Sequence, residues 1–287
     1  MPLSTVAIPL LFVLIWATGF VMARLVAPHV EPFTFLALRF ALASAVLASV
    51  AFLMRAPWPR SARDWRNAIG IGLLLQGVYL GGVFWAVRHG LPAGVSALIA
   101  SAQPLLTALL AGPLLDERVP LMRRVGICVG FLGVGLVLAP KLGGTDAYPL
   151  ATLVASLVSL LGITMATIWQ KRSGSTLDMR AGTAIQFGAS AFLMLAAALL
   201  TETMVIDPTR DFWIGLLWSI FGLSIGAIFL LLVMIRRGAV VGVASWLFLV
   251  PPVSALMAYG LFGETFSALQ LAGMAVATAG VALATRG

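Results

Sequence analysis

Residues 149–169 read PLATLVASLVSLLGITMATIW, a run of 21 residues without a charged side chain. A helix needs about 20 mostly apolar residues to cross the hydrocarbon core of a bilayer. Similar runs recur along the 287 residues of the chain. We therefore predict an all-α polytopic membrane protein with ten spanning helices, at residues 6–25, 33–54, 67–87, 93–115, 122–140, 149–169, 181–200, 212–235, 239–262 and 267–285.

The composition supports this class and excludes others. Hydrophobic residues make up 61% of the chain and charged residues only 10%, whereas a typical soluble domain carries about 25% charged residues. The loops between ten spans leave no room for a soluble domain, which excludes a soluble enzyme, a secreted disulfide scaffold and a disordered chain. Because Cys128 is the only cysteine, no internal disulfide or thiolate cluster can form. We expect no metal and no cofactor.

The distribution of lysine and arginine predicts the orientation in the membrane. Cytoplasmic loops carry an excess of both residues. With both termini on the cytoplasmic side, the inner loops hold 13 of these residues, and the outer loops hold four, namely Arg24, Arg88, Lys141 and Arg210. The net charge of +8 is therefore a sign of topology rather than of nucleic-acid binding.

The two halves of the chain match each other at a shift of about 147 residues, which predicts two five-helix units, residues 1–140 and 148–287. Because five is odd, the second unit enters the membrane from the opposite side. Many secondary transporters build alternating access from such inverted repeats, although duplication can also simply enlarge a bundle. The matching positions include Gly94-Val95 and Pro104 with Gly242-Val243 and Pro252, and Arg39-Phe40 with Gln186-Phe187.

Small residues form stripes on the last helix of each unit. They recur one or two turns apart, at Gly126, Gly130 and Gly133 and at Gly273, Ala277 and Gly280. Such stripes let helix backbones approach closely in lipid. We interpret them as packing surfaces, either between these two helices or between two protomers, and the oligomeric state stays open.

Short motifs in both halves carry a family resemblance. They are Trp16 with Gly19-Phe20, Leu38-Arg39-Phe40, and two acidic turns, Asp116-Glu117 and Gly263-Glu264, each followed by a glycine-rich helix. With the five-plus-five duplication, the chain resembles the EamA-type branch of the drug/metabolite transporter superfamily, most closely the YddG-type amino-acid exporters. It departs from the usual pattern at Asp116-Glu117-Arg118, where Gly-Glu-Pro or Gly-Glu-Thr is common.

The resemblance implies a basket of helices around a central cavity in the bacterial inner membrane. The third, fourth, eighth and ninth helices would line the cavity together with the first and sixth, and the fifth and tenth would stand aside as supports. It implies a transporter and not an enzyme. The sequence agrees, because it has no nucleotide-binding G-x-x-x-x-G-K-[ST] loop, no H-E-x-x-H and no G-x-S-x-G.

All ten carboxylates fall in loops or at helix ends. Proton-coupled pumps usually titrate a carboxylate within the bilayer, so we expect facilitated export, or coupling through some other group. Glu117 and Glu264 are candidates for function, but each begins a turn before a helix. We expect them to cap helix N-termini.

Polar and aromatic residues on several spans suggest a binding site. Gln76 and Tyr79 lie three residues apart on one face of the third span, and an amide beside an aromatic ring suits a zwitterionic or aromatic solute. Their repeat equivalents are Ser224 and Ala227. Trp16 lies mid-span and is a further candidate, and it could be faced by Ser159 and Thr164 of the sixth span. Bonding between helices is the alternative role for these polar groups.

Proline interrupts the fourth and ninth spans at corresponding places, which is a sequence sign of a transport site. Each proline removes a backbone donor, so both helices should bend near the middle of the membrane. The residues concerned are Ser101, Gln103 and Pro104 in the fourth span and Ser245, Trp246, Pro251 and Pro252 in the ninth. Gly19 and Gly162 are candidate hinges, or else packing contacts.

Arg39 is the clear intramembrane cation. It could attract a substrate carboxylate, or it could extend outward and bond carbonyl groups of a neighbouring helix. The predicted function is export of small metabolites, foremost amino acids including aromatic ones, by alternating access. Efflux of drugs or other metabolites is the alternative within this class, and a lipid-handling or scaffold protein is the alternative outside it. The expected partners are a small-molecule solute and the bilayer.

Overall fold

The computed structural model describes residues 4–115, 120–141, 147–173, 177–227, 230 and 249–286. Their regular elements are helices, apart from an isolated antiparallel bridge between Val30 and Ile206. The first half contains α1 (Ser4–Val26), α2 (Pro32–Leu53), α3 (Ala62–Gly72), η1 (Leu73–Val78), α4 (Tyr79–Arg88), α5 (Ala93–Ser101), α6 (Gln103–Leu115), α7 (Leu121–Leu138) and η2 (Ala139–Lys141). The second half contains α8 (Leu150–Ser173), α9 (Met179–Thr201), α10 (Arg210–Leu217), η3 (Trp218–Gly226), α13 (Val250–Phe262) and α14 (Ala268–Arg286).

Helices stand at all ten expected spans, although residues 228–248 of the eighth and ninth are described only at Leu230. In the described part of the chain, six helical stretches are long and apolar enough to cross a membrane by themselves, and shorter apolar helices accompany them. The prediction of an all-α polytopic membrane fold is confirmed.

Local sequence signals explain where several helices begin and end. The hydroxyl of Ser61 accepts a hydrogen bond from Asp64 N at 3.1 Å at the start of α3, and Thr209 caps α10 in the same way. Pro32 occupies the first turn of α2, where its missing N–H costs nothing. At the end of α13, Gly263 takes a φ of 66°, a conformation that glycine adopts without strain.

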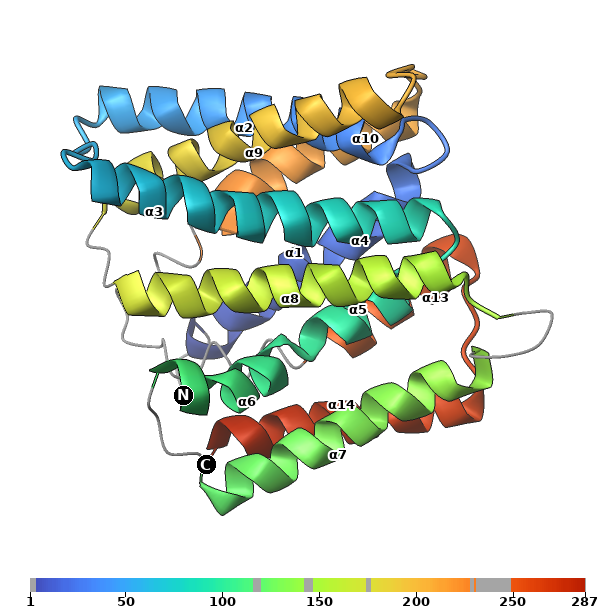
Figure 1. The fold of residues 1–287 in the computed structure, drawn as a ribbon. Coiled ribbons are helices and arrows are strands. Elements are labelled where there is room, and N and C mark those ends of the chain that lie inside the picture. Colours follow the sequence, from blue (N-terminus) through green and yellow to red (C-terminus); the bar gives the residue numbers. More distant parts are fainter. Residues whose placement is uncertain are drawn as a thin grey trace.

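Helices from opposite halves pack as antiparallel pairs. α2 lies along α9 (Figure 1), with the Ser44 hydroxyl donating to Ala184 O at 2.8 Å between the two helices. α3, η1 and α4 lie along α8, α1 lies along α10 and η3, and α5 packs on α13. The second and seventh spans, which are equivalent in the repeat, therefore run in opposite directions, as an inverted repeat requires.

α7 and α14 form a separate pair at one edge of the bundle (Figure 1). A Cβ atom on Gly133 would lie 2.2 Å from Ala277 N, and one on Gly280 would lie 2.1 Å from Gly130 N. The backbones thus touch where the small residues face each other. The two stripes serve packing within one chain, and the fifth and tenth spans stand aside as expected.

Among the residues that the structure describes, three spans are interrupted. The third and eighth spans each contain a π-helical segment, η1 and η3, at places that correspond in the two halves. The fourth span breaks at Ala102, between α5 and α6, just before Pro104. π-Helical turns are rare, and they occur frequently at functional sites.

α8 packs directly on η1 and α4. The Ser159 hydroxyl donates to Tyr79 O, and the Thr164 hydroxyl donates to Leu160 O at 2.7 Å. Both residues are buried. The Ser159 hydroxyl thus bonds the neighbouring span and the Thr164 hydroxyl its own helix, and neither residue lines the two cavities that Trp16 lines.

Candidate functional site

A cavity of about 400 Å³ lies between α1, α2, the α3–η1–α4 span, α8, α9 and η3. Small-molecule sites usually enclose about 300–1,000 Å³. Apolar side chains cover most of the wall, as is common for such sites, and a few polar groups interrupt them. The polar residues of the wall are Arg39, Gln76, Tyr79, Gln170, Asp178, Thr183, Gln186 and Ser224.

The cavity brings together many residues that the sequence analysis singled out. Gln76 and Tyr79, from η1 and the start of α4, share it with Trp16 and Gly19 of α1 and with Ser224 of η3. Gln76 lies inside one π-helical segment and Ser224 inside the other. The two irregular segments therefore place repeat-related polar side chains on one cavity.

The walls differ from those implied by the family resemblance. The second and seventh spans contribute, with Arg39 from α2 and Gln186 from α9, whereas α5 and α6 of the fourth span do not reach this cavity. Gln186 and Phe187 were missed as site residues. Their match with Arg39-Phe40 in the repeat was a usable signal, because repeat-related positions should lie on equivalent walls.

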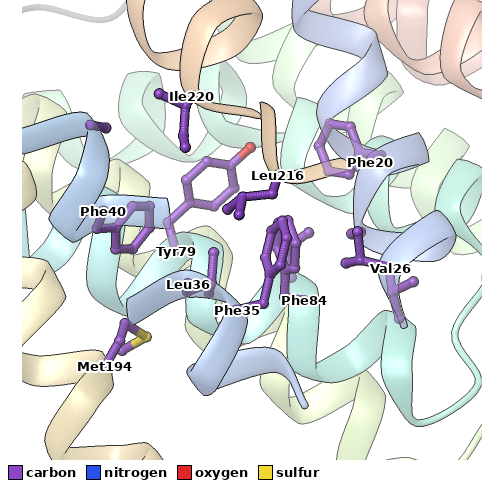
Figure 2. Close-up of a cluster of buried hydrophobic side chains, with 14 of the residues drawn as sticks. Phe20, Val26, Phe35, Leu36, Phe40, Tyr79, Phe84, Met194, Leu216 and Ile220 are labelled. Atoms are coloured by element: carbon purple, nitrogen blue, oxygen red, sulfur yellow. The ribbon is translucent and has the colours of Figure 1, made fainter. Parts of the chain in front are cut away.

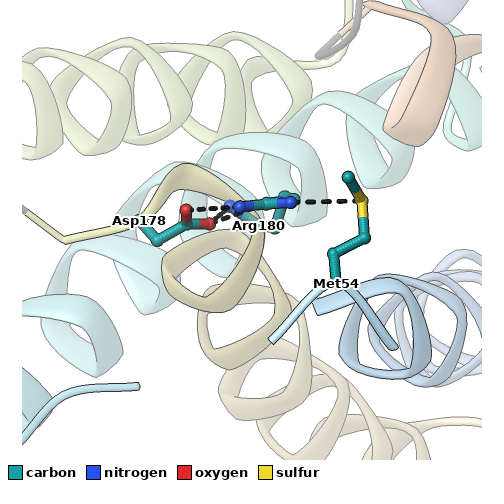
Figure 3. Close-up of polar contacts among 3 residues, drawn as sticks. All are labelled: Met54, Asp178 and Arg180. Atoms are coloured by element: carbon teal, nitrogen blue, oxygen red, sulfur yellow. Dashed lines mark hydrogen bonds and ion pairs between the residues drawn. The ribbon is translucent and has the colours of Figure 1, made fainter. Parts of the chain in front are cut away.

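The cavity extends to the end of the bundle where α3 and α9 begin, which we call the mouth end. Ala68, Asp178 and Met179 line it there. α1 begins and α14 ends at the same end (Figure 1). The Asp178 carboxylate accepts hydrogen bonds from Arg180 Nε at 3.0 Å and Nη2 at 2.8 Å, while Arg180 Nη1 contacts Met54 Sδ at 3.1 Å (Figure 3). The Arg180 guanidinium holds the pKa of Asp178 below its ordinary value.

The opposite end, where α2 and α10 begin, is filled with aromatic and aliphatic side chains; we call it the closed end. Phe35 stacks on Phe84 with ring centroids 5.6 Å apart and meets Phe212 edge-on at 6.3 Å. These rings are buried, and Figure 2 shows Phe35 and Phe84 beside Val26 and Leu216. Burial of several large aromatic side chains is strongly favourable, so this cluster seals the bundle beyond Tyr79.

Carboxylates fasten the two halves together at the closed end. Glu202 accepts hydrogen bonds from Phe33 N, Thr34 N and the Thr34 hydroxyl, each at 2.7 Å, and so caps α2. Glu264 caps α5 through Ala93 N at 3.0 Å and Gly94 N at 3.4 Å. Helix capping was therefore the correct interpretation of Glu264, but the capped helix belongs to the other half. Glu117 lies outside the described residues.

Glu31 makes the reciprocal contact. Its carboxylate accepts from Thr203 N at 2.7 Å, from the Thr203 hydroxyl at 2.8 Å and from Met204 N at 3.1 Å. The hydroxyl bond of Thr203 is the main reason that the pKa of Glu31 lies below its ordinary value. The contacts between the two halves at this end are thus charge-assisted hydrogen bonds.

A second, smaller cavity of about 90 Å³ holds the residues predicted on the fourth span. Ser101, Gln103 and Pro104 line it, together with Trp16, Phe20 and Tyr79, which also line the main cavity. Gln103 Nε2 donates to Thr107 at 3.0 Å and to Thr167 of α8 at 3.1 Å. The fourth-span residues therefore stand behind a wall of three aromatic rings rather than in the main cavity.

The remaining predicted residues have other positions. Gly162 packs against α3–η1–α4, because a Cβ there would lie 2.8 Å from Val78 Cγ1. Pro251 and Pro252 occupy the first turn of α13, the place where proline fits a helix best. Ser245 and Trp246 lie outside the described residues.

Arg39 is 4% exposed and faces the main cavity. Its Nη2 atom lies 3.5 Å from the Ser224 hydroxyl, at the limit of a hydrogen bond. Its guanidinium carbon lies 5.7 Å from the centroid of the Phe40 ring. Whether Arg39 is a structural group or a ligand contact depends on which other groups form hydrogen bonds with its guanidinium.

Comparison with known proteins agrees with this architecture. A model of the EamA-like transporter family matches residues 3–139 and again residues 150–286. The Escherichia coli (strain K12) protein named "Uncharacterized inner membrane transporter YedA" is 26% identical over 275 residues, covering 96% of this chain and 88% of that protein. The Salmonella typhimurium (strain LT2) protein named "Probable amino-acid metabolite efflux pump" is 25% identical over 283 residues, covering 95% of this chain and 91% of that protein.

A solved crystal structure shares the fold. It superposes with a TM-score of 0.66 at 23% sequence identity, and the alignment covers 99% of this chain and 96% of the other. The family match extends over both halves, and the helices pair across the halves as two inverted units. The chain belongs to the EamA-like transporter family and is a membrane transporter built from two five-helix repeats.

Proposed function

We propose that this transporter exports small metabolites, foremost amino acids including aromatic ones, across the bacterial inner membrane. The observation that carries the proposal is the cavity of about 400 Å³, whose wall combines amides, aromatic rings and one guanidinium. This size suits a single small solute. The name of the Salmonella relative, an amino-acid metabolite efflux pump, supports this substrate class.

The different states of the two ends of the cavity support transport by alternating access. The cavity extends to the mouth end, while aromatic packing and carboxylate bonds seal the closed end. The excess of lysine and arginine in one set of loops supports a cytoplasmic mouth end, with both termini on that side. Residues 1–140 and 148–287 would then exchange their conformations to seal the mouth end and open the other.

The broken spans supply candidate hinges for this exchange. α5 and α6 meet at Ala102, two residues before Pro104, and Pro251 and Pro252 lie in the first turn of α13. A Cβ atom on Gly19 would lie 3.8 Å from Leu223 Cδ2 of η3, so the glycine leaves room for α1 and η3 to shift past each other there. Carriers of this kind need no bound cofactor, and facilitated or secondary transport is the mode we propose.

Uptake into proteoliposomes tests this function. The purified protein is reconstituted without an ion gradient, and a panel of labelled aromatic, aliphatic and acidic amino acids is presented. Saturable uptake of several of them, absent from protein-free vesicles, is the expected result. Failure to transport any of them, with the protein folded and correctly inserted, would reject amino acids as substrates.

A further inference from the structure

Arg39 carries a charge that the chain does not balance within the membrane. The ten carboxylates all lie in loops or at helix ends, and residues 228–248 contain no Asp or Glu in their sequence. Among the residues that line the described cavity wall, the carboxylate is Asp178. It lies at the mouth end and accepts a hydrogen bond from Arg180 Nη2 at 2.8 Å. No spanning helix therefore supplies a counter-ion for Arg39.

The guanidinium also lacks hydrogen-bond partners. In the described part of the chain, its Nε and Nη1 atoms are buried and bond to no protein group, and Nη2 has only the 3.5 Å contact with Ser224. Buried charges are normally paired and hydrogen-bonded, because desolvating a charge without compensation is costly. The Arg39 side chain forms part of the wall of a cavity large enough for a solute, with its Nε and Nη1 atoms buried behind that wall.

We infer that Arg39 binds the carboxylate of the transported solute and that the solute needs no α-amino group. This inference rests on the proposed function and narrows its substrate requirement to a carboxylate with an apolar or aromatic tail, with or without an ammonium group. A guanidinium presents a planar fork of donors that matches a carboxylate with two parallel hydrogen bonds. A bound monoanion would balance the charge of Arg39.

The one carboxylate on the described wall, Asp178, lies at the mouth end and is bonded to Arg180 at 2.8 Å. The polar groups Gln76, Gln186, Tyr79 and Ser224 are neutral, and the remaining surface includes aromatic and aliphatic side chains such as Trp16. These groups can hold an apolar tail and accept one or two hydrogen bonds. An ammonium would instead add a second positive charge near Arg39, so removing it should not weaken binding.

The test compares three ligands that share one aromatic tail. Labelled 3-phenyllactate carries the carboxylate without the ammonium, phenylalaninol carries the ammonium without the carboxylate, and phenylalanine carries both. Uptake of labelled 3-phenyllactate into proteoliposomes is measured, with the other two as competitors, in sodium gluconate. Sodium chloride and sodium phosphate replace gluconate in parallel assays to detect a site for inorganic anions.

We expect saturable 3-phenyllactate uptake that phenylalaninol does not inhibit. Arg39→Gln should raise the apparent KM ten-fold to a hundred-fold, since it removes hydrogen bonds to a charged group. Arg39→Lys keeps the charge but not the planar fork of donors, so its apparent KM should lie between those of the wild type and Arg39→Gln. Arg24→Gln is the matched control, because it removes an equal charge from an exposed position of α1 and should leave uptake unchanged.

Five results separate the possibilities. Uptake of phenylalanine without uptake of 3-phenyllactate overturns the inference and leaves the proposed function intact. Uptake of 3-phenyllactate without phenylalanine supports the inference and rejects amino acids. Inhibition of 3-phenyllactate uptake by phenylalaninol as strong as that by phenylalanine overturns the role of Arg39 as a carboxylate site. Inhibition of this uptake by millimolar chloride or phosphate does the same. Equal KM values for wild type and a folded Arg39→Gln protein show that Arg39 is structural.

Discussion

Glu31 and Asp178 stand 147 residues apart, at the N-caps of α2 and α9, yet they make different contacts. Asp178 caps its own helix through Arg180 N at 2.9 Å. Glu31 does not cap α2 but crosses to Thr203 and Met204, while Glu202 caps α2 in its place. The two halves are thus joined by exchanged carboxylates at the closed end, whereas the equivalent acid at the mouth end bonds within its own half.

Glu202→Gln should loosen the closed end. The neutral amide keeps the size of the side chain but weakens three charge-assisted hydrogen bonds, at a cost of about 1–2 kcal/mol. The readout is labelling of a Val87→Cys probe by a membrane-impermeant maleimide, in a Cys128→Ser background because Cys128 is exposed. Val87 is fully buried, so labelling should rise several-fold.

Asp207→Asn is the control for that variant. It removes a charge at the same end, from a pair with His29 in which the Asp207 side chain is 61% exposed. Exposed ion pairs contribute little to stability. Equal labelling of the Glu202→Gln and Asp207→Asn proteins would show that Glu202 does not hold the closed end.

The Glu31 contact should weaken in acid. The pKa of Glu31 lies below its ordinary value of 4.5, chiefly because the Thr203 hydroxyl bonds the carboxylate. Its stabilising contribution is therefore complete above about pH 4.5 and is lost as the pH falls through the lowered value. The midpoint temperature of thermal unfolding in detergent should fall more steeply below pH 4.5 for the wild type than for Glu31→Gln. Parallel curves would contradict this role.

Gly133→Ala should destabilise the fold through the α7–α14 pair. The new methyl group would lie 2.2 Å from Ala277 N, so the backbones must separate, at about 1–3 kcal/mol. Gly135→Ala, two residues further on, meets nothing within 4 Å and should be neutral or stabilising by up to about 1 kcal/mol. Thermal unfolding in detergent measures both. Equal midpoints would show that close backbone approach is not needed.

Tyr79→Phe should raise the KM for uptake by up to about ten-fold with little change in folded protein, because it removes one hydroxyl from the cavity wall. Tyr79→Ala is a poorer test, since Tyr79 belongs to the buried cluster of Figure 2 and its truncation leaves a void. Tyr259→Phe, on an exposed ring of α13, is the control. Equal KM values for Tyr79→Phe and Tyr259→Phe would show that the Tyr79 hydroxyl does not contribute to solute binding.

The sequence predicted the fold better than it predicted the cavity wall. Uncharged runs such as residues 149–169 determine spans through length and hydropathy alone. The stripes at Gly126 and Gly273 predicted packing surfaces but left open whether the partner was the other stripe or a second protomer. Gln76, Tyr79, Trp16, Arg39 and Ser224 were all predicted as site residues and line one cavity, and their contact with a solute stays a prediction.

Three features of the site were not predictable in this way. The π-helical segments η1 and η3 have no apolar periodicity of their own, yet an extra residue per turn changes which side chains face inward. Ser159 looks like a cavity residue in sequence, but its hydroxyl bonds a carbonyl of the neighbouring span. Glu264 caps a helix of the other half, a partner that local sequence does not reveal.

Counterflow in proteoliposomes tests most directly whether one central cavity is exposed alternately to the two sides. Vesicles containing the wild-type protein are preloaded with unlabelled phenylalanine, or with 3-phenyllactate, and then diluted into a trace of the same labelled compound. The account predicts a transient accumulation of label above its equilibrium level, because unlabelled solute leaving the vesicle returns the cavity to the outside. Uptake that is saturable in neither compound, or that rises to equilibrium without any overshoot, would contradict an alternating-access carrier for these solutes.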